Sequence, residues 1–238
     1  MSETVDAVLD HVAVAVRELE PAERRWTEQL GGRWVGWSDT GAFRNRQLRY
    51  RGGGKLELLA PSPADPSPDN FVRRYLDRFG SAVHHVTLKV ADLALAIAIV
   101  RAEGLDVVDV QMEDAGWREG FLRPSQVGGL VIQLAWSSYS DDEWAARLGH
   151  TIEEPAPDAA VLRGPLLRHT DLGAAARLWT MLGADVDASD GMITCSWPGS
   201  PLTVVVERGQ MPGPVGLRMD GAPALPAEPA LGPAVLPT

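Results

Sequence analysis

Apolar positions along residues 9–16 follow the period of a partly buried strand, and helical spacing replaces that period over residues 18–30. Pro21 suits the first turn of such a helix, and the Gly31–Gly32 pair suits its end. Strand-like runs then return, and glycines at 52–54 predict a hairpin turn between the last two. The first module is therefore predicted to have the order βαβββ, with its later strands over residues 33–38, 43–51 and 55–60.

A second copy of this pattern begins at residue 83. The spacing from His11 to Leu19 is eight residues, and the spacing from His85 to Leu93 is also eight. Between the copies, residues 61–80 include Pro61, Pro63 and Pro66 ahead of a short helical stretch, which is typical of a linker. The second copy is predicted to comprise a strand, a helix and three strands, over residues 83–90, 92–103, 105–111, 118–123 and 129–135.

A degraded third copy follows the second. Aligning Leu172 with Leu93 places Gly164 where His85 stands in the second copy, so the third copy has no histidine at this position. No site chemistry is visible in it, and we expect it to stabilise or cap the first two copies or to form a subunit contact. Its helix and strands are predicted near residues 172–182, 186–197 and 202–207.

These repeats predict how the chain divides. Paired modules are expected over residues 1–140, with module one at 8–61 and module two at 82–136, followed by the degenerate third module at 151–220. The last segment, 221–238, is rich in proline and alanine and has no regular period, so we expect a disordered tail. A strand-like piece just before it, at 215–219, could begin a fourth copy.

Composition narrows the classes of function. The 238 residues are 45% hydrophobic, which is enough for a core, and the formal net charge of -10 argues against a nucleic-acid partner. Cys195 is the only cysteine, which excludes a disulfide within the chain and a multi-thiolate metal site. The first residues lack a signal-peptide pattern, and no apolar run is long enough for a membrane helix. We expect a cytoplasmic protein without a membrane partner.

Two histidines occupy equivalent positions in the first two copies, namely His11 and His85. The closing strand of each copy carries one polar side chain among apolar ones, Glu57 in the first and Gln133 in the second. A lone histidine on a strand is usually structural, but this matched pair favours metal binding. Adjacent strand residues face opposite ways, so His84 is expected on the outer face. The other two histidines match no motif and are expected in loops: His150 and His169.

The quoted residues resemble the vicinal oxygen chelate superfamily, which includes glyoxalase I, methylmalonyl-CoA epimerase, extradiol dioxygenases and antibiotic-binding resistance proteins. Residues 8–61 and 82–136 look most like methylmalonyl-CoA epimerase. The segments that carry this resemblance are Leu9-Asp10-His11-Val12-Ala13-Val14, Lys55-Leu56-Glu57-Leu58-Leu59-Ala60-Pro61, His84-His85-Val86, Phe121-Leu122-Arg123-Pro124 and Gly128-Gly129-Leu130-Val131-Ile132-Gln133-Leu134.

The resemblance implies an α+β fold in which paired βαβββ modules form a cupped mixed sheet. It also implies one divalent metal ion, bound by His11, Glu57, His85 and Gln133. Such donors suit Co²⁺, Zn²⁺, Ni²⁺, Mn²⁺ or Fe²⁺. In the epimerase pattern the amide comes from the first module and the glutamate from the second, whereas this chain exchanges them. The exchange keeps the donor set, so metal binding is expected to survive.

The implied activity is that of a metal-dependent isomerase or epimerase, or a lyase of the glyoxalase type, which enolises a small oxygen-chelating acid or acyl thioester. Glu57 could serve as one catalytic base, and the second base is not at a motif position. Three acids between the middle strands of module two could supply it: Glu113, Asp114 and Glu119. An acyl-CoA substrate would need cations for its phosphates, and one strand offers Arg44, Arg46, Arg49 and Arg51.

Two other functions stay open. Two histidines and a glutamate also form the facial triad of non-haem iron oxygenases, so an extradiol-type dioxygenase is the first alternative. The second is a non-catalytic protein that binds a small molecule such as an antibiotic, which the tryptophans near the expected cup favour: Trp34, Trp37 and Trp117. A homodimer is open in each case.

Overall fold

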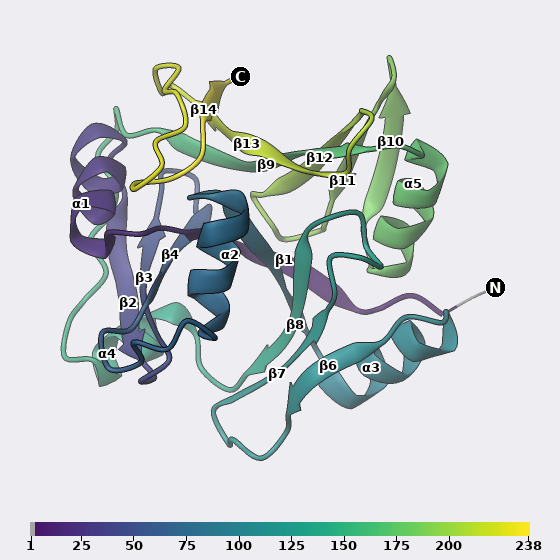
Figure 1. The fold of residues 1–238 in the computed structure, drawn as a ribbon, viewed down its shortest axis with the longest axis horizontal. Coiled ribbons are helices and arrows are strands. Elements are labelled where there is room, and N and C mark those ends of the chain that lie inside the picture. The colour runs from purple at the N-terminus through teal and green to yellow at the C-terminus, as the bar shows by residue number, and fades with distance from the viewer. Residues whose placement is uncertain (1–2) are drawn as a thin grey trace. The chain divides into compact units, whose positions relative to one another are not determined.

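The predicted α+β fold is confirmed by a computed structural model, which describes residues 3–238 (Figure 1). Its strands form two mixed sheets. The strand order is β2-β3-β4-β1-β5-β8-β7-β6 in the eight-stranded sheet and β10-β11-β12-β9-β13-β14 in the six-stranded sheet. No helix among the described residues is long and apolar enough to cross a membrane.

The chain separates into two compact units that do not follow chain order. Unit 1 holds the N-terminal residues through His11, together with His85–Ser138 and Gly164–Val215. Unit 2 holds Val12–His84, Tyr139–Arg163 and Gly216–Thr238. Strand β1, Ala7–Ala15, therefore contributes its first residues to unit 1 and its last to unit 2. The predicted division at about residue 140 stays a prediction.

Module one follows the predicted order. After β1, the helical stretch consists of α1 and a short π-helix, η1, and three antiparallel strands come next. Glu57 on β4 pairs in register with Gln47 on β3, so both side chains lie on one face of this sheet. The bounds are α1 Leu19–Arg24, η1 Arg25–Gln29, β2 Arg33–Asp39, β3 Phe43–Arg49 and β4 Lys55–Pro61.

The linker after module one contains helix α2, Phe71–Phe79. Asn70 caps it by accepting hydrogen bonds from the backbone N–H groups of Val72 and Arg73. Val72 and Leu76 on its buried face pack into a cluster with Leu59 of β4. A second short helix of unit 2, α4 (Asp141–Arg147), begins with a capping box between Ser140 and Glu143.

Module two repeats the order within a few residues of the predicted bounds. Its first strand, β5, runs parallel to its last strand, β8, and pairs Thr87 in register with Gln133. Strand β7 is antiparallel to both β8 and β6, and α3 packs on these strands. The bounds are β5 Val83–Val90, α3 Leu93–Ala102, β6 Val107–Gln111, β7 Trp117–Leu122 and β8 Val131–Ser137.

The third copy has the same order, with one difference from the prediction. Residues 186–197 were expected to be one strand, but a turn at Asp190–Gly191 divides them, since both residues have positive φ. Gly164 also has positive φ, and a Cβ there would collide with the carbonyl oxygen of Thr203. The bounds are β9 Val161–His169, α5 Leu172–Met181, β10 Asp185–Ser189, β11 Met192–Ser196 and β12 Thr203–Arg208.

The C-terminal segment differs from the predicted disorder. After β13, Gly213–Asp220, the chain forms a short strand β14, Val235–Pro237, which pairs in parallel with β13. Buried donors of unit 2 hold the residues between them. Arg25 donates to the carbonyl oxygen of Pro226 at 3.0 Å, and the indole N–H of Trp26 donates to that of Leu231 at 3.0 Å. The order of this segment therefore comes from its carbonyl groups, which a search for periodic side chains does not detect.

Candidate metal centre

The two repeat-related histidines lie together in unit 1. His11 is in the middle of β1 and His85 is near the start of β5, with 1% and 5% of their surfaces exposed. Their ring centroids are 5.9 Å apart, at an interplanar angle of 68°. Each offers a ligand nitrogen within 4.8 Å of the other's. A pair of buried imidazoles at this separation can serve as ligands to a single ion.

Neighbouring polar groups orient the ring of His11. Its Nδ1 lies 2.7 Å from Oδ2 of Asp10, whose other oxygen is 3.4 Å from the ammonium of Lys89. Its Nε2 lies 3.0 Å from the hydroxyl of Thr87, which is fully buried. A carboxylate at one ring nitrogen is the common way to fix a metal-binding histidine so that the other nitrogen faces the metal. Neither Asp10 nor Thr87 stands at a position that the repeat pattern marks as a candidate ligand.

Gln133 lies in the same network. Its side-chain oxygen accepts a hydrogen bond of 2.5 Å from the Thr87 hydroxyl, and its amide nitrogen donates to Glu119 at 2.7 Å. Glu119 also accepts a hydrogen bond of 2.6 Å from the indole N–H of Trp117. An amide oxygen has two lone pairs, so Gln133 can accept from Thr87 and still act as a ligand. Its role as the fourth ligand stays a prediction.

Glu57 lies in unit 2, on β4, and is 7% exposed. Two amide side chains of β3, Asn45 and Gln47, each donate a hydrogen bond of 3.2 Å to its Oε2. Both amides therefore bind the same oxygen of the Glu57 carboxylate and fix its orientation. This arrangement places a carboxylate oxygen in the interior of module one.

Both modules pair an amide with a carboxylate on their last two strands, but in opposite order. Asn45 on β3 donates to Glu57 on β4, whereas Gln133 on β8 donates to Glu119 on β7. In module one Glu57 pairs in register with Gln47, which is two residues after Asn45. In module two Gln133 pairs in register with Phe121, which is two residues after Glu119, so Asn45 and Glu119 occupy equivalent positions. Aligning the two modules strand by strand could have revealed this relation in the sequence.

The remaining histidines do not join this group among the described residues. His84 was expected on an outer face, but helix α2 covers it, with the Tyr75 ring 4.5 Å and the Phe71 ring 6.1 Å away. Burial lowers the pKa of His84 to about 4, so it is neutral at pH 7. His150 stacks on Trp37, and His169 is the last residue of β9 and is partly exposed.

The arginines of β3 are paired with acids of their own unit. Arg44 lies 2.8 Å from Glu20, and Arg46 lies 3.4 Å from Glu23. Arg49 lies 3.7 Å from both Asp141 and Asp142 of α4, and Arg51 donates to a backbone carbonyl. These pairs account for the excess of arginine on this strand. They give no support to a cluster of cations prepared for coenzyme A phosphates.

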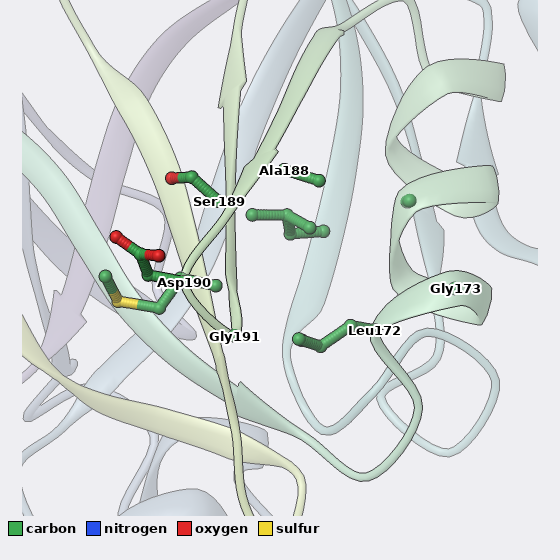
Figure 2. A pocket seen from close by; sticks show the side chains of 9 residues that line it. Leu172, Gly173, Ala188, Ser189, Asp190 and Gly191 are labelled. Atoms are coloured by element: carbon green, nitrogen blue, oxygen red, sulfur yellow. The ribbon is translucent and has the colours of Figure 1, made fainter.

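The third copy carries no comparable group of ligands among the described residues. Figure 2 shows a small pocket there, formed by α5, β10 and β11 and lined mostly by apolar atoms, with Leu172, Ala188 and Asp190 at its edges. Neither a histidine nor a cysteine lines it. Cys195 is buried, and burial raises the pKa of its thiol to about 12. The thiol is thus structural.

A family comparison agrees with these features. Residues 10–121 match the family described as the Glyoxalase/Bleomycin resistance protein/Dioxygenase superfamily. The matched segment contains His11, Glu57 and His85, and Gln133 follows it. No curated protein matches the chain.

Solved structures support the fold. Methylmalonyl-CoA epimerase from Mycobacterium tuberculosis is similar with a TM-score of 0.51 and 24% identity, over 58% of this chain and 93% of that one. A hypothetical protein from Staphylococcus aureus is similar with a TM-score of 0.65 and 10% identity, over 98% of this chain and 100% of that one. At these identities the likenesses show the fold alone, and the second extends it to the third copy and the C-terminal segment.

Proposed function

We propose that this protein is a metal-dependent enzyme that enolises a small acid or acyl thioester whose two oxygens can chelate one metal ion, as the resemblance to methylmalonyl-CoA epimerase implies. The observation that carries the proposal is the set of His11, His85 and Glu57. A ligand nitrogen of His11 lies within 4.8 Å of a ligand nitrogen of His85 in unit 1, and all three side chains are buried.

The chemistry of these residues fits a divalent metal. Two imidazoles, a carboxylate and the Gln133 amide form a donor set suited to Co²⁺, Zn²⁺, Ni²⁺, Mn²⁺ or Fe²⁺. The buried Glu57 carboxylate would balance part of the charge of a bound cation. Asp10 supports the same function, because its carboxylate contacts Nδ1 of His11. This contact leaves Nε2 on the side of the ring that faces away from Asp10, as is common for metal-binding histidines. When bound, the metal would stabilise negative charge that develops on the substrate oxygens.

Glu57 would also carry a proton in this proposal. Asn45 and Gln47 fix its Oε2, so the carboxylate keeps one orientation while the substrate binds. An enolisation begins when a base removes the proton next to the carbonyl carbon. The substrate class is a 1,3-dicarbonyl acid or thioester, with a coenzyme A ester such as methylmalonyl-CoA as the first candidate. The pairing of the β3 arginines with acids leaves a smaller acid as the other candidate.

One observation favours a second function, an extradiol-type oxygenase. Two histidines and one glutamate are the donor types of a facial triad, and the Gln133 oxygen already accepts a hydrogen bond from Thr87. If Gln133 does not bind the metal, three protein ligands remain, as in non-haem iron oxygenases. The two functions differ in the metal that supports them and in whether oxygen is consumed.

Deuterium incorporation tests the proposal directly. The protein loaded with Co²⁺ is incubated with methylmalonyl-CoA in heavy water, and deuterium at carbon 2 is followed by mass spectrometry. We expect exchange with the wild type and with a His169→Asn control, and no exchange with His85→Ala. Oxygen uptake with a catechol in the presence of Fe²⁺, without exchange, would replace the proposal by the oxygenase. Ligand binding without metal would instead indicate a non-catalytic binding protein.

A further inference from the structure

We propose that Glu119 is the second proton-transfer group of this site, an inference that rests on the proposed enolisation. Inverting a carbon centre requires a proton to leave one face and another to arrive at the opposite face. Glu57 can serve one face only. In unit 1 the carboxylate of Glu119 on β7 lies on the same face of the sheet as Gln133 and Thr87.

Contacts place Glu119 beside this site. Thr87 on β5 links the ring of His11 to Gln133 on β8, and Gln133 in turn donates to Glu119 on β7 at 2.7 Å. The carboxylate is therefore on the same side of β5, β8 and β7 as the candidate ligands. Glu119 itself is partly exposed, as a group that meets a substrate must be.

The contacts of Glu119 also fix its orientation. Its Oε2 accepts from both the Gln133 amide and the indole N–H of Trp117, the latter at 2.6 Å. Alternation along β7 puts Trp117 and Phe121 on the same face as Glu119, and both are half-buried. A carboxylate between two aromatic side chains can meet the carbon of a substrate while those side chains exclude water.

The other two acids of this region do not qualify. Asp114 accepts hydrogen bonds from the backbone N–H groups of Gly116 at 2.6 Å and Trp117 at 3.0 Å, and these bonds lower the pKa of its carboxyl. It therefore shapes the turn before β7. Glu113 is exposed in the loop after β6, and its backbone N–H donates to the side chain of Gln111. Glu119 alone of the three is joined to Gln133.

The exchanged order of amide and carboxylate explains why the second acid lies in module two. In module one the position equivalent to Glu119 is Asn45, which donates to Glu57. Each module thus contributes one histidine, one amide and one carboxylate. The two carboxylates that an inversion needs are divided between the modules.

The proton step balances without another reactant. One carboxylate accepts the proton from carbon, the C–H electron pair becomes part of the enolate, and the other carboxylate, in its acid form, returns a proton to the same carbon. The product differs from the substrate only in configuration. Exchange of each carboxyl group with solvent restores the starting protonation state and introduces deuterium in heavy water.

The test compares the two epimers of methylmalonyl-CoA separately, with Glu119→Gln, Glu119→Asp and the wild type in heavy water. Glutamine preserves the size of the side chain and can still accept hydrogen bonds from Gln133 and Trp117, so the fold should persist. Glu113→Gln is the matched control on a nearby exposed acid. Co²⁺ affinity is measured on each variant by competition with a chelator, as a readout independent of activity.

We expect Glu119→Gln to lose epimerisation by about 100-fold or more, a typical loss for a proton-transfer group. It should still incorporate deuterium into one epimer, through Glu57, and not into the other, with Co²⁺ affinity unchanged and partial recovery in Glu119→Asp. If Glu119→Gln epimerises at the wild-type rate, the role of Glu119 is overturned and the proposed function is not. If Glu119→Gln loses exchange with both epimers, the role of Glu119 is also overturned, because a residue that only maintains the structure of the site affects both epimers equally. A wild type inert toward both epimers would overturn the proposed function together with this inference.

Discussion

Removing residues 222–238 should strongly destabilise unit 2, although the sequence predicts that this segment is disordered. The segment supplies carbonyl acceptors to Arg25, Trp26, Ser81 and the backbone N–H of Arg17, at 2.7–3.0 Å. Arg25 and Trp26 are only 3% and 0% exposed. At about 0.5–1.5 kcal/mol for each hydrogen bond, these contacts contribute about 2–6 kcal/mol. This is a large part of the 5–15 kcal/mol by which a domain is usually stable.

Guanidinium chloride unfolding, followed by tryptophan fluorescence, measures this loss as a lower transition midpoint. A milder variant, Trp26→Phe, removes the N–H donor to Leu231 together with part of a fully buried ring, and should lower the free energy of unfolding by at least about 1 kcal/mol. Trp197→Phe is a matched control in unit 1, where the indole N–H donates to the carbonyl of Leu182. A deletion variant within 1 kcal/mol of the wild type would refute this account of the C-terminal segment.

Three further predictions concern unit 1. Asp10→Asn should weaken Co²⁺ binding by about 10–100-fold because it removes the anion that orients His11, and an unchanged affinity in chelator competition would contradict this. Thr87→Val should lower the free energy of unfolding by about 1–3 kcal/mol, because Gln133 loses a buried donor; equal chemical stability of the two proteins would exclude that role. Since burial raises the pKa of Cys195 to about 12, the thiol should react with a disulfide reagent at pH 8 only after unfolding, and rapid labelling of the native protein would show otherwise.

The repeat predicted much of the fold because each strand and helix has a local period in the sequence. It also predicted that His11 and His85 meet, since equivalent positions of related modules lie in equivalent places. The turn at Asp190–Gly191 was missed because a short break between two strands hardly alters the alternation. His84 was assigned to an outer face because strand periodicity gives the side of the sheet but not what covers it.

Contacts between side chains of different strands could not be predicted from one strand at a time. The link from Gln133 to Glu119 depends on the register of β7 against β8, which periodicity leaves open. The arginines of β3 suggested an anionic ligand, yet their partners are acids far along the chain, such as Asp141. The C-terminal segment is held through its backbone carbonyl groups, and composition carries no information about these.

Metal content is the measurement that tests the central claim most directly. The wild type, His85→Ala and the control His169→Asn are each loaded with Co²⁺, freed of excess metal and measured by elemental analysis and visible absorption. We predict one ion per chain for the wild type and the control, and none for His85→Ala, with all three folded by circular dichroism. Stoichiometric metal in His85→Ala, or none in the wild type, would contradict the assignment of His11, Glu57 and His85 as the metal centre.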